Sequence, residues 1–508
     1  MRIAFRTDAS DLIGTGHLMR TLTLADALAA AGHTCRFVLR EHSGTPAGLV
    51  AARGHALSLL PPPDGSADSD LAHAAWLGVS QARDAADTRA ALTDGCDWLV
   101  ADHYALDHRW ETALRPAANR IMAIDDLADR RHDCDLLLDQ NPQAAPDRYA
   151  GLLPAGATAL VGPRHALLRD EFVSLRTADR AARGPLLVYF GGVDADGATM
   201  LALRGIEQAG LAAGGVTVVA GARNPHLAAI RTWVDRHTAA VLHEGNAPLA
   251  ELIAGARIGL GAAGATALER CCLALPSIVL TIAANQRPGA AALAAMPAAL
   301  WLGDAAECTP ERIAAALVTL DRAPELAAAM GRTGAVLVDG QGTARVVRAL
   351  TSAGVVLRPA TESDCDTIWR WRNDPATRSQ SLGADTIPLA AHGEWYAAAL
   401  ANPDRRIFLG ESGGAGIGVV RFDRVGDTAL VSIFLAPERI GEGYGSALLA
   451  AGCDAIAHAW PDLAAIEADV LAANPASQAI FARAGFRPLH ARLRRDLSRP
   501  AGSLWEAQ

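Results

Sequence analysis

Short apolar runs alternate with longer segments of helical periodicity through about the first 350 residues of this chain. Each run is bounded by Gly, Asp or Asn, and such alternation is typical of parallel sheets whose strands are joined by crossover helices. The runs fall into two sets. The first set is RIAFR, TCRFVL, DWLVADH, RIMAIDD and DLLLDQN, and the second is PLLVYFGG, VTVVAG, AVLHEG, RIGLGAAG and PSIVLTIA. We therefore predict an α/β fold with two doubly wound, Rossmann-type subdomains, at residues 1–165 and 166–353.

A different pattern begins near residue 354. The segment TARVVRALTSAG (343–354) is typical of a closing helix with Gly354 at its C-cap. Beyond it, RIFLGES, GIGVVRFD and ALVSIFLAP follow one another without intervening helices, which indicates an antiparallel meander. We predict a separate α+β domain at 355–495 and a tail at 496–508.

The composition favours an enzyme or binding protein for small molecules. The formal net charge of −9 gives no electrostatic reason to expect nucleic acid or an anionic membrane as partner. No stretch approaches the length of uninterrupted apolar residues that a membrane span needs, so we expect a cytoplasmic protein. The eight cysteines show no C-x-x-C and no ligand-like spacing with histidine, so we expect reduced, mostly buried thiols and no metal.

The loop DASDLIGTGH (8–17) joins the first predicted strand to a helix and carries the first candidate site. Gly14 and Gly16 allow a tight turn and the close approach of a ligand, and the N–H groups at the start of the helix favour a phosphate. A structural turn is the alternative interpretation. His17 stands at the helix start, where the dipole disfavours imidazolium, so it can accept a proton as a general base.

Later segments offer groups suited to a nucleotide sugar. In YFGGVDADGAT (189–199), Gly191 and Gly192 form a second strand-to-helix turn that could hold a diphosphate. Glu269 lies about one turn into the helix of GLGAAGATALER, where a carboxylate can hold ribose hydroxyls or simply be a solvated charge. Asn285 and Gln286 end TIAANQ, with amides that suit sugar hydroxyls or acetamido groups and also suit an ordinary turn.

Four motifs in order carry a resemblance over roughly residues 1–350. They are RTDASDLIGTGHLMR, AIDDLADRRHDCDLLLDQN, YFGGVDADGAT and GAAGATALERCCLALPSIVLTIAANQ, and together they resemble the UDP-sugar hydrolases of pseudaminic acid biosynthesis. The resemblance implies a GT-B-like fold and hydrolysis of UDP-2,4-diacetamido-2,4,6-trideoxy-β-L-altropyranose to UDP and the free sugar. It implies cleavage of the sugar C–O bond with inversion, His17 as the residue that activates water, Asn285 as a substrate ligand and Glu269 in the ribose-binding position.

An acidic cluster, Asp125, Asp126 and Asp129, follows one of the predicted strands. Its spacing matches no standard metal loop, so we interpret these carboxylates as solvated or structural.

The C-terminal segment has its own glycine turn. In VSIFLAPERIGEGYGSALLAAG, a strand is followed by Gly441, Gly443 and Gly445 and then by an apolar helix. The segment ADVLAANPASQAIFARAGFRPL (468–489) adds a predicted strand, an Asn-Pro break, a short helix and a closing turn. These segments resemble the GNAT acetyltransferases over about residues 355–495. The resemblance implies acetyl-CoA as co-substrate, bound by the three glycines, Arg439, Asn474 and Ser477.

Two positions depart from the GNAT pattern. Ile440 replaces the usual Gln or Arg, with Arg439 one place earlier, and a loop that works through backbone amides tolerates this change. Phe481 stands where many members have a tyrosine that protonates the leaving thiolate. Phenyl cannot donate a proton, so that role is unassigned or falls to water. Arg372 and Asn373 lie where the acceptor would enter, or on a helix that faces the core.

The two resemblances together predict a bifunctional enzyme. Its C-terminal domain would acetylate the 4-amino group of UDP-4-amino-4,6-dideoxy-N-acetyl-β-L-altrosamine, and its N-terminal part would then release UDP. Two alternatives stay open: a GT-B glycosyltransferase that passes the sugar to an acceptor, and a GNAT unit that is a degenerate acetyl-CoA sensor, a protein-binding module or a protein acetylase.

Overall fold

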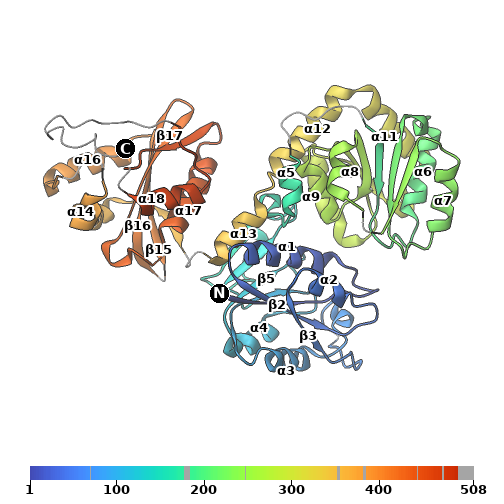
Figure 1. Ribbon diagram of the computed structural model, residues 1–508, viewed down its shortest axis with the longest axis horizontal. Helices are drawn as coiled ribbons and strands as arrows, with labels where there is room; N and C mark the ends of the chain where they lie inside the picture. Colours follow the sequence, from blue (N-terminus) through green and yellow to red (C-terminus); the bar gives the residue numbers. More distant parts are fainter. Residues whose placement is uncertain are drawn as a thin grey trace, which may run out of the picture. The chain divides into compact units, whose positions relative to one another are not determined.

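The computed structural model describes residues 1–68, 70–176, 184–245, 247–351, 355–381, 385–412, 414–442, 444–471 and 474–489. The chain forms two compact units, Met1–Val347 and Arg348–Gln508 (Figure 1). The predicted positions Gly354 and Gly443, and the predicted tail at 496–508, lie outside the described residues.

The first sheet has the strand order β3-β2-β1-β4-β5-β6-β7, and every pairing in it is parallel. Its strands are β1 (Arg2–Thr7), β2 (Thr34–Arg40), β3 (Ala56–Leu60), β4 (Cys96–Asp102), β5 (Ala118–Ile124), β6 (Leu136–Asp139) and β7 (Thr158–Val161). Helices α1 (Gly16–Ala30) and α2 (Ala47–Ala52) cover one face, and α3 (Gln81–Ala91) and α4 (His108–Leu114) cover the other (Figure 1). The order of winding reverses between β1 and β4, so the ends of these two strands meet although they are distant in sequence.

The second sheet has the order β10-β9-β8-β11-β12-β13 and is also parallel. Its strands are β8 (Leu186–Tyr189), β9 (Val216–Ala220), β10 (Ala240–Glu244), β11 (Ile258–Ala262), β12 (Ser277–Thr281) and β13 (Leu300–Asp304). The helices are α5 (Asp170–Ser174), α6 (Ala198–Gln208), α7 (Leu227–Asp235), α8 (Leu249–Gly255), α9 (Ala265–Cys272), α10 (Arg287–Ala295), α11 (Pro310–Arg322), α12 (Pro324–Leu337) and α13 (Gly342–Thr351). Separate apolar clusters on the two faces show that helices cover both sides.

Both parallel sheets confirm the predicted α/β fold class, but the sequence analysis missed β3, β7 and β13. All three are edge strands, and much of each is partly exposed. Central strands of a parallel sheet are buried on both faces and therefore form continuous apolar runs, whereas edge strands give a weaker signal.

The second unit contains a mixed sheet in the order β14-β15-β16-β17-β18. Its strands are β14 (Val356–Pro359), β15 (Arg405–Ser412), β16 (Ala415–Val425), β17 (Thr428–Leu435) and β18 (Ala465–Ala468), and its helices are α14 (Cys365–Asn373), α15 (Pro375–Ser379), α16 (Leu389–Ala401), α17 (Tyr444–Ala459) and α18 (Pro475–Arg483). Strands β14 to β17 pair in antiparallel fashion, as the meander predicted, and β18 pairs with β17 in parallel.

Strand β18 lies earlier than the sequence analysis placed it. The prediction began the strand at Ala468, whereas the structure ends it there. The last pairing with β17 joins Val431 to Ala468, and the two strands then part. The apolar residues after Ala468 line a cavity instead of pairing with a strand. Their apolar pattern resembles that of a buried strand, and this is why the prediction extended the strand over them.

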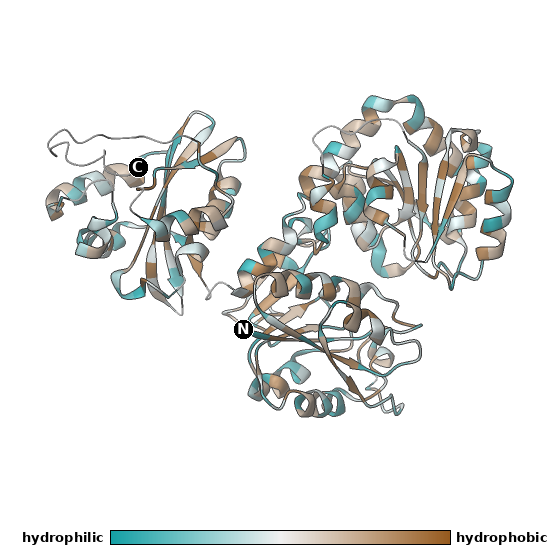
Figure 2. Ribbon diagram, in the orientation of Figure 1, coloured by the Kyte–Doolittle hydropathy of each residue, from teal (hydrophilic) through white to brown (hydrophobic). Residues whose placement is uncertain are grey.

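The strands of the two parallel sheets consist mainly of hydrophobic residues, and hydrophilic residues are frequent on the surrounding helices (Figure 2). Along β16, Val419 packs in one cluster with α14 and α16, and Val420 packs in another with α17, as the two-residue period of a strand requires. All eight cysteines lie in described residues and are free thiols, six of them buried. Among the described residues, no helix is both long and apolar enough to cross a membrane.

Candidate active sites

The loop after β1 places His17 in the first turn of α1. Gly14 adopts a left-handed conformation, φ +77°, and its N–H donates to the carbonyl of Ser10. The Ser10 hydroxyl accepts from the amides of Leu12 and Ile13, so the loop is a tight, internally bonded turn. His17 itself is 9% exposed. Binding of substrate by Gly14 and Gly16 stays a prediction.

A buried carboxylate orients the His17 ring. His17 Nδ1 lies 2.6 Å from Asp102 Oδ1, at the end of β4. Arg20, one turn further along α1, donates to both oxygens of Asp102, with Nε and Nη2 each 2.6 Å away. Arg20 Nη1 also reaches Asp126, 3.2 Å away. With the Nδ1 proton on the Asp102 side, the lone pair of His17 Nε2 is the one that can accept a proton.

Charges inside this cluster keep Asp102 ionised. Burial by itself would raise the pKa of Asp102, but Arg20 and His17 hold it well below its usual range. The carboxylates in turn hold the pKa of the buried Arg20 well above its ordinary value. The arrangement is that of a general base held by an acidic partner, the pair that activates a nucleophile in many hydrolases.

Aromatic side chains form one wall beside His17. The ring of Tyr104 contacts His17 edge-to-face, with centroids 4.7 Å apart. Trp76 stacks on Tyr104 at 5.5 Å and also meets His17 edge-on at 6.2 Å. Such a wall limits the number of water molecules that can approach the base.

The sequence analysis found His17 and missed its partners Asp102 and Arg20. Asp102 lies next to the end of the predicted run DWLVADH and is the last residue of β4, and acidic residues at the carboxyl end of a parallel strand face the ligand side of such a sheet. Arg20 follows His17 by three residues and therefore lies on the same face of α1. These two signals were present in the sequence.

The acidic cluster divides between two roles. Asp125 is buried and pairs with Arg130, 2.8 Å away, while Asp129 binds the same guanidinium. Asp126 instead faces Arg20 in the His17 site. No group of three His, Cys, Asp or Glu side chains suited to a metal occurs in the described ranges.

In the second sheet, Gly191 and Gly192 follow β8. Gly191 has φ +102°, and Gly192 lies so close to Gly221 that a Cβ on Gly221 would come within 1.8 Å of the Gly192 carbonyl oxygen. Asp194 caps α6 by accepting from the amides of Ala198 and Thr199. The start of α6 is therefore already occupied by a carboxylate, and a diphosphate at this turn would have to bind the glycine backbone itself.

Glu269 lies on α9 as predicted and has an unusual environment. Its Oε2 is buried without a hydrogen-bond partner, and Arg169 Nη2 lies 3.8 Å from Oε1. Burial raises the pKa of Glu269 to about 7, although Arg169 and Arg270 oppose the shift. A buried oxygen without a partner is costly, and a ligand hydroxyl would relieve that cost.

Asn285 and Gln286 differ in their availability to a ligand. Asn285 is exposed, whereas Gln286 Oε1 accepts from the amide of Ile282, 3.1 Å away, and thereby holds the turn after β12. The role of Asn285 and Gln286 in binding substrate stays a prediction.

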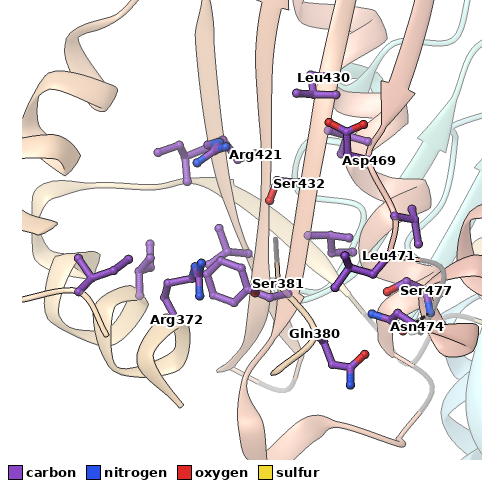
Figure 3. Close-up of a pocket in the computed structure, with 18 of the residues that line it drawn as sticks. Arg372, Gln380, Ser381, Arg421, Leu430, Ser432, Asp469, Leu471, Asn474 and Ser477 are labelled. Atoms are coloured by element: carbon purple, nitrogen blue, oxygen red, sulfur yellow. Dashed lines mark hydrogen bonds between the residues drawn. The ribbon is translucent and has the colours of Figure 1, made fainter. Parts of the chain in front are cut away.

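The second unit contains a cavity of about 550 Å³ where β17 and β18 part. Asn474 and Ser477 lie together on one side of it (Figure 3). Asn474 Oδ1 accepts from the Ser477 amide, 2.9 Å away, and so caps α18. Phe481 also lines the cavity and packs edge-to-face on Phe486, so the position of the missing tyrosine faces the cavity.

The described glycines of the GNAT turn are placed at the start of α17. Gly441 has φ +89°, and a Cβ on Gly445 would come within 2.7 Å of the Ile480 side chain. Arg439 pairs with Glu442 at 3.2 Å and lies over the ring of Tyr444. The turn thus requires glycine for backbone conformation and for packing. Binding of acetyl-CoA by these residues stays a prediction.

Comparison with known proteins finds a similar family or protein for each of the two units. Residues 355–487 match the family described as "Acetyltransferase (GNAT) domain". The UDP-2,4-diacetamido-2,4,6-trideoxy-beta-L-altropyranose hydrolase of Campylobacter jejuni is 21% identical over 238 residues, which cover 47% of this chain and 76% of that protein.

Two solved structures match different shares of the chain. UGT2 of Phytolacca americana, solved with UDP-2-fluoro-glucose and pterostilbene, is 15% identical, with a TM-score of 0.50 over 68% of this chain and 98% of that one. Spermidine N-acetyltransferase of Vibrio cholerae, solved with CoA and spermine, is 21% identical over 26% of this chain and 81% of that one, with a TM-score of 0.25.

The chain is therefore a fusion of a GT-B-like unit with a GNAT acetyltransferase domain. The GT-B-like unit is a homologue of the UDP-sugar hydrolase named above, as the four sequence motifs predicted.

Proposed function

We propose that the chain is a bifunctional enzyme of pseudaminic acid biosynthesis. Its GNAT domain transfers acetyl from acetyl-CoA to the 4-amino group of UDP-4-amino-4,6-dideoxy-N-acetyl-β-L-altrosamine. Its N-terminal unit hydrolyses the product, UDP-2,4-diacetamido-2,4,6-trideoxy-β-L-altropyranose, to UDP and the free sugar. The observation that carries the hydrolase assignment is the buried pair of His17 and Asp102, because hydrolysis needs a base to activate water.

In the hydrolytic step, His17 Nε2 takes a proton from water as the water oxygen attacks the anomeric carbon. The bond from that carbon to the diphosphate oxygen breaks on the opposite face, the electron pair leaves with UDP, and the configuration inverts. Asp102 keeps the proton on Nδ1 and stabilises the imidazolium that forms. Arg20 holds the Asp102 carboxylate in place through two hydrogen bonds. The imidazolium then returns its proton to solvent.

The second sheet would hold the nucleotide. Glu269 Oε2, buried without a partner, would accept a hydrogen bond from a ribose hydroxyl. The backbone at Gly191 and Gly192 would approach the diphosphate, and Asn285 and Gln286 would contact the sugar. Gly14 and Gly16 would let the substrate approach His17 closely. No step requires a metal ion.

In the acetyl-transfer step, the neutral acceptor amine attacks the thioester carbonyl and loses a proton to solvent, the C–S bond breaks, and the thiolate of CoA leaves. Backbone amides of the turn at Gly441, Gly443 and Gly445 would hold the pyrophosphate of CoA, with Arg439 nearby. Asn474 and Ser477 line the cavity where the pantetheine arm would run. Phe481 has no proton to give, so water would protonate the thiolate.

A glycosyltransferase with a GNAT unit that only senses acetyl-CoA, or that acetylates a protein, is the second candidate. Phe481 at the cavity is the observation that favours it, since a phenyl ring cannot act as an acid. This candidate requires an acceptor for UDP release.

The deciding experiment measures UDP release from the 4-amino UDP-sugar with and without acetyl-CoA. The proteins are the intact chain, His17→Ala, and His108→Ala as a matched control, because His108 is exposed on α4. UDP release that needs both acetyl-CoA and His17 supports the two activities and their order. Consumption of acetyl-CoA without UDP release, or release only with an added acceptor, favours the glycosyltransferase instead.

A further inference from the structure

The cavity of the GNAT domain has two chemically different sides. Asn474 and Ser477 lie on the side proposed above to receive acetyl-CoA, and the side chains of Arg372 and Arg421 lie on the opposite side (Figure 3). Among the described residues that line the cavity, Asp469 is the one carboxylate. Figure 3 places Asp469 beside Leu430, away from Arg372. The side opposite acetyl-CoA is therefore cationic.

Arg421 is held in position by its neighbours on β16 and α16. Its Nε lies 2.9 Å from Asp423 Oδ2, and its guanidinium lies over the ring of Trp395, 5.5 Å from the centroid. Arg405 lies over the same ring at 5.6 Å and pairs with the same Asp423. The single carboxylate of Asp423 thus pairs with two guanidinium groups, so the net charge around Arg421 is positive.

Arg372 adds a second cation from α14. Burial lowers the pKa of Arg372, and the nearby charges of Arg421 and Arg378 lower it further. Like charges drawn together in a partly buried site repel each other, and a bound anion removes that repulsion. Guanidinium groups are also the side chains whose planar N–H donors best match phosphate oxygens.

We propose that Arg372 and Arg421 form an anion subsite that binds the diphosphate of the acceptor during acetyl transfer. The inference rests on the proposed function for the identity of the acceptor and deepens it by assigning the groups that select it. The subsite would hold the diphosphate of the acceptor, so that the sugar, which carries the 4-amino group, points toward the thioester. It also disfavours polycationic acceptors such as spermidine, because the two guanidinium groups repel a cation.

The test compares two acceptors that share the amino sugar and differ in phosphate. One is the UDP-4-amino sugar and the other is its methyl glycoside, and initial rates of CoA release are measured with the full chain. Arg421→Gln and Arg372→Gln should each raise KM for the UDP-sugar about tenfold or more and change its kcat little. Both variants should leave KM for the methyl glycoside and for acetyl-CoA unchanged. Arg421→Lys, which keeps the charge without the fork, should show a smaller rise.

Arg424→Gln is the matched control, because Arg424 lies on the same strand but pairs with Asp462 and lies over Trp460, outside the cavity lining. An unchanged KM for the UDP-sugar in both cavity variants overturns the proposal. An equal rise for the methyl glycoside also overturns it, since that result means a general structural defect.

A separate binding experiment distinguishes failure of this inference from failure of the proposed function. Calorimetric titration with inorganic pyrophosphate should show one binding equivalent fewer in the Arg372→Gln/Arg421→Gln double variant than in the wild-type chain. If wild type acetylates no UDP-amino sugar but this equivalent is lost, the proposed acceptor is wrong and the subsite stands. If the stoichiometry is the same in both proteins, the subsite is refuted.

Discussion

The pair of His17 and Asp102 makes Asp102→Asn the most informative substitution in the N-terminal unit. Asp102 Oδ1 faces both His17 Nδ1 and Arg20 Nη2, and Oδ2 faces Arg20 Nε, each at 2.6 Å. Asparagine supplies one acceptor in place of two. If its NH2 group faces His17, Nδ1 must become the acceptor, the proton moves to Nε2, and the base can no longer take a proton from water.

The opposite orientation of the amide is also unfavourable. Its NH2 group then opposes the Nε–H of Arg20, so two donors face each other in a buried site. The negative charge that would stabilise the imidazolium is lost in both orientations. The corresponding substitution in a Ser-His-Asp triad lowers kcat about 10⁴-fold. We expect a loss of about 10³-fold or more in kcat for UDP release.

The assay follows UDP release from the diacetamido UDP-sugar and binding of UDP in parallel. Asp97→Asn is the matched control, because Asp97 lies near the opposite end of the same strand, where it accepts from the amide of Arg2. Asp102→Asn should keep the wild-type dissociation constant for UDP, since Asp102 contacts His17 and Arg20 and not the nucleotide site. A folded variant that keeps more than about a fifth of the wild-type kcat would refute the role of Asp102.

Three further outcomes follow from the same structure. Buried carboxylates raise the pKa of His132 to about 9, although burial by itself lowers it. Protonated His132 therefore contributes stability that is complete below its unfolded pKa of about 6.5 and is lost as pH rises through 9. The free energy of unfolding should therefore fall by on the order of 3 kcal/mol across this window in wild type and stay flatter in His132→Gln, as measured by urea denaturation. Phe481→Tyr restores a proton donor at the GNAT cavity and should raise kcat of acetyl transfer about tenfold; an unchanged kcat with normal acetyl-CoA binding would mean that water suffices. Gly261→Ala places a Cβ within 2.4 Å of the Tyr189 carbonyl oxygen and should destabilise the chain by about 2 kcal/mol, whereas Gly255→Ala, with no atom within 4 Å, should have little effect on the same denaturation curve.

The joining of the two units fits their proposed chemistry. The acetylated product of the GNAT domain would be the substrate of the hydrolase, so one chain would supply consecutive steps. Both units would also recognise the diphosphate of the same sugar nucleotide, by backbone groups at Gly191 and Gly192 in the N-terminal unit and by arginines in the GNAT domain. Such a fusion requires no channel between the units, because the product can pass from one to the other through solution.

The sequence predicted the candidate site where the chemistry is carried by local pattern. His17 follows a glycine loop at a strand-to-helix turn, and Asn474 and Phe481 lie in the short segment NPASQAIF. The sequence predicts that Arg372 lies near the acceptor or on a core-facing helix. It does not predict that Arg421, 49 positions away, lines the same cavity. Asp102 was part of a predicted strand and still received no role.

Periodicity and turn residues are local properties, so the sequence by itself determined the alternation of most strands with helices, the parallel character of the first two sheets and the meander of the third. Only the tertiary structure decided which strand ends meet. Because β1 pairs with β4 and not only with β2, His17 and Asp102 come into contact across 85 positions of sequence. Because β17 and β18 part after Val431, a cavity opens that the apolar pattern had concealed. The packing of crossover helices on the two faces of a sheet decides which strands become neighbours, and no short stretch of sequence encodes that packing.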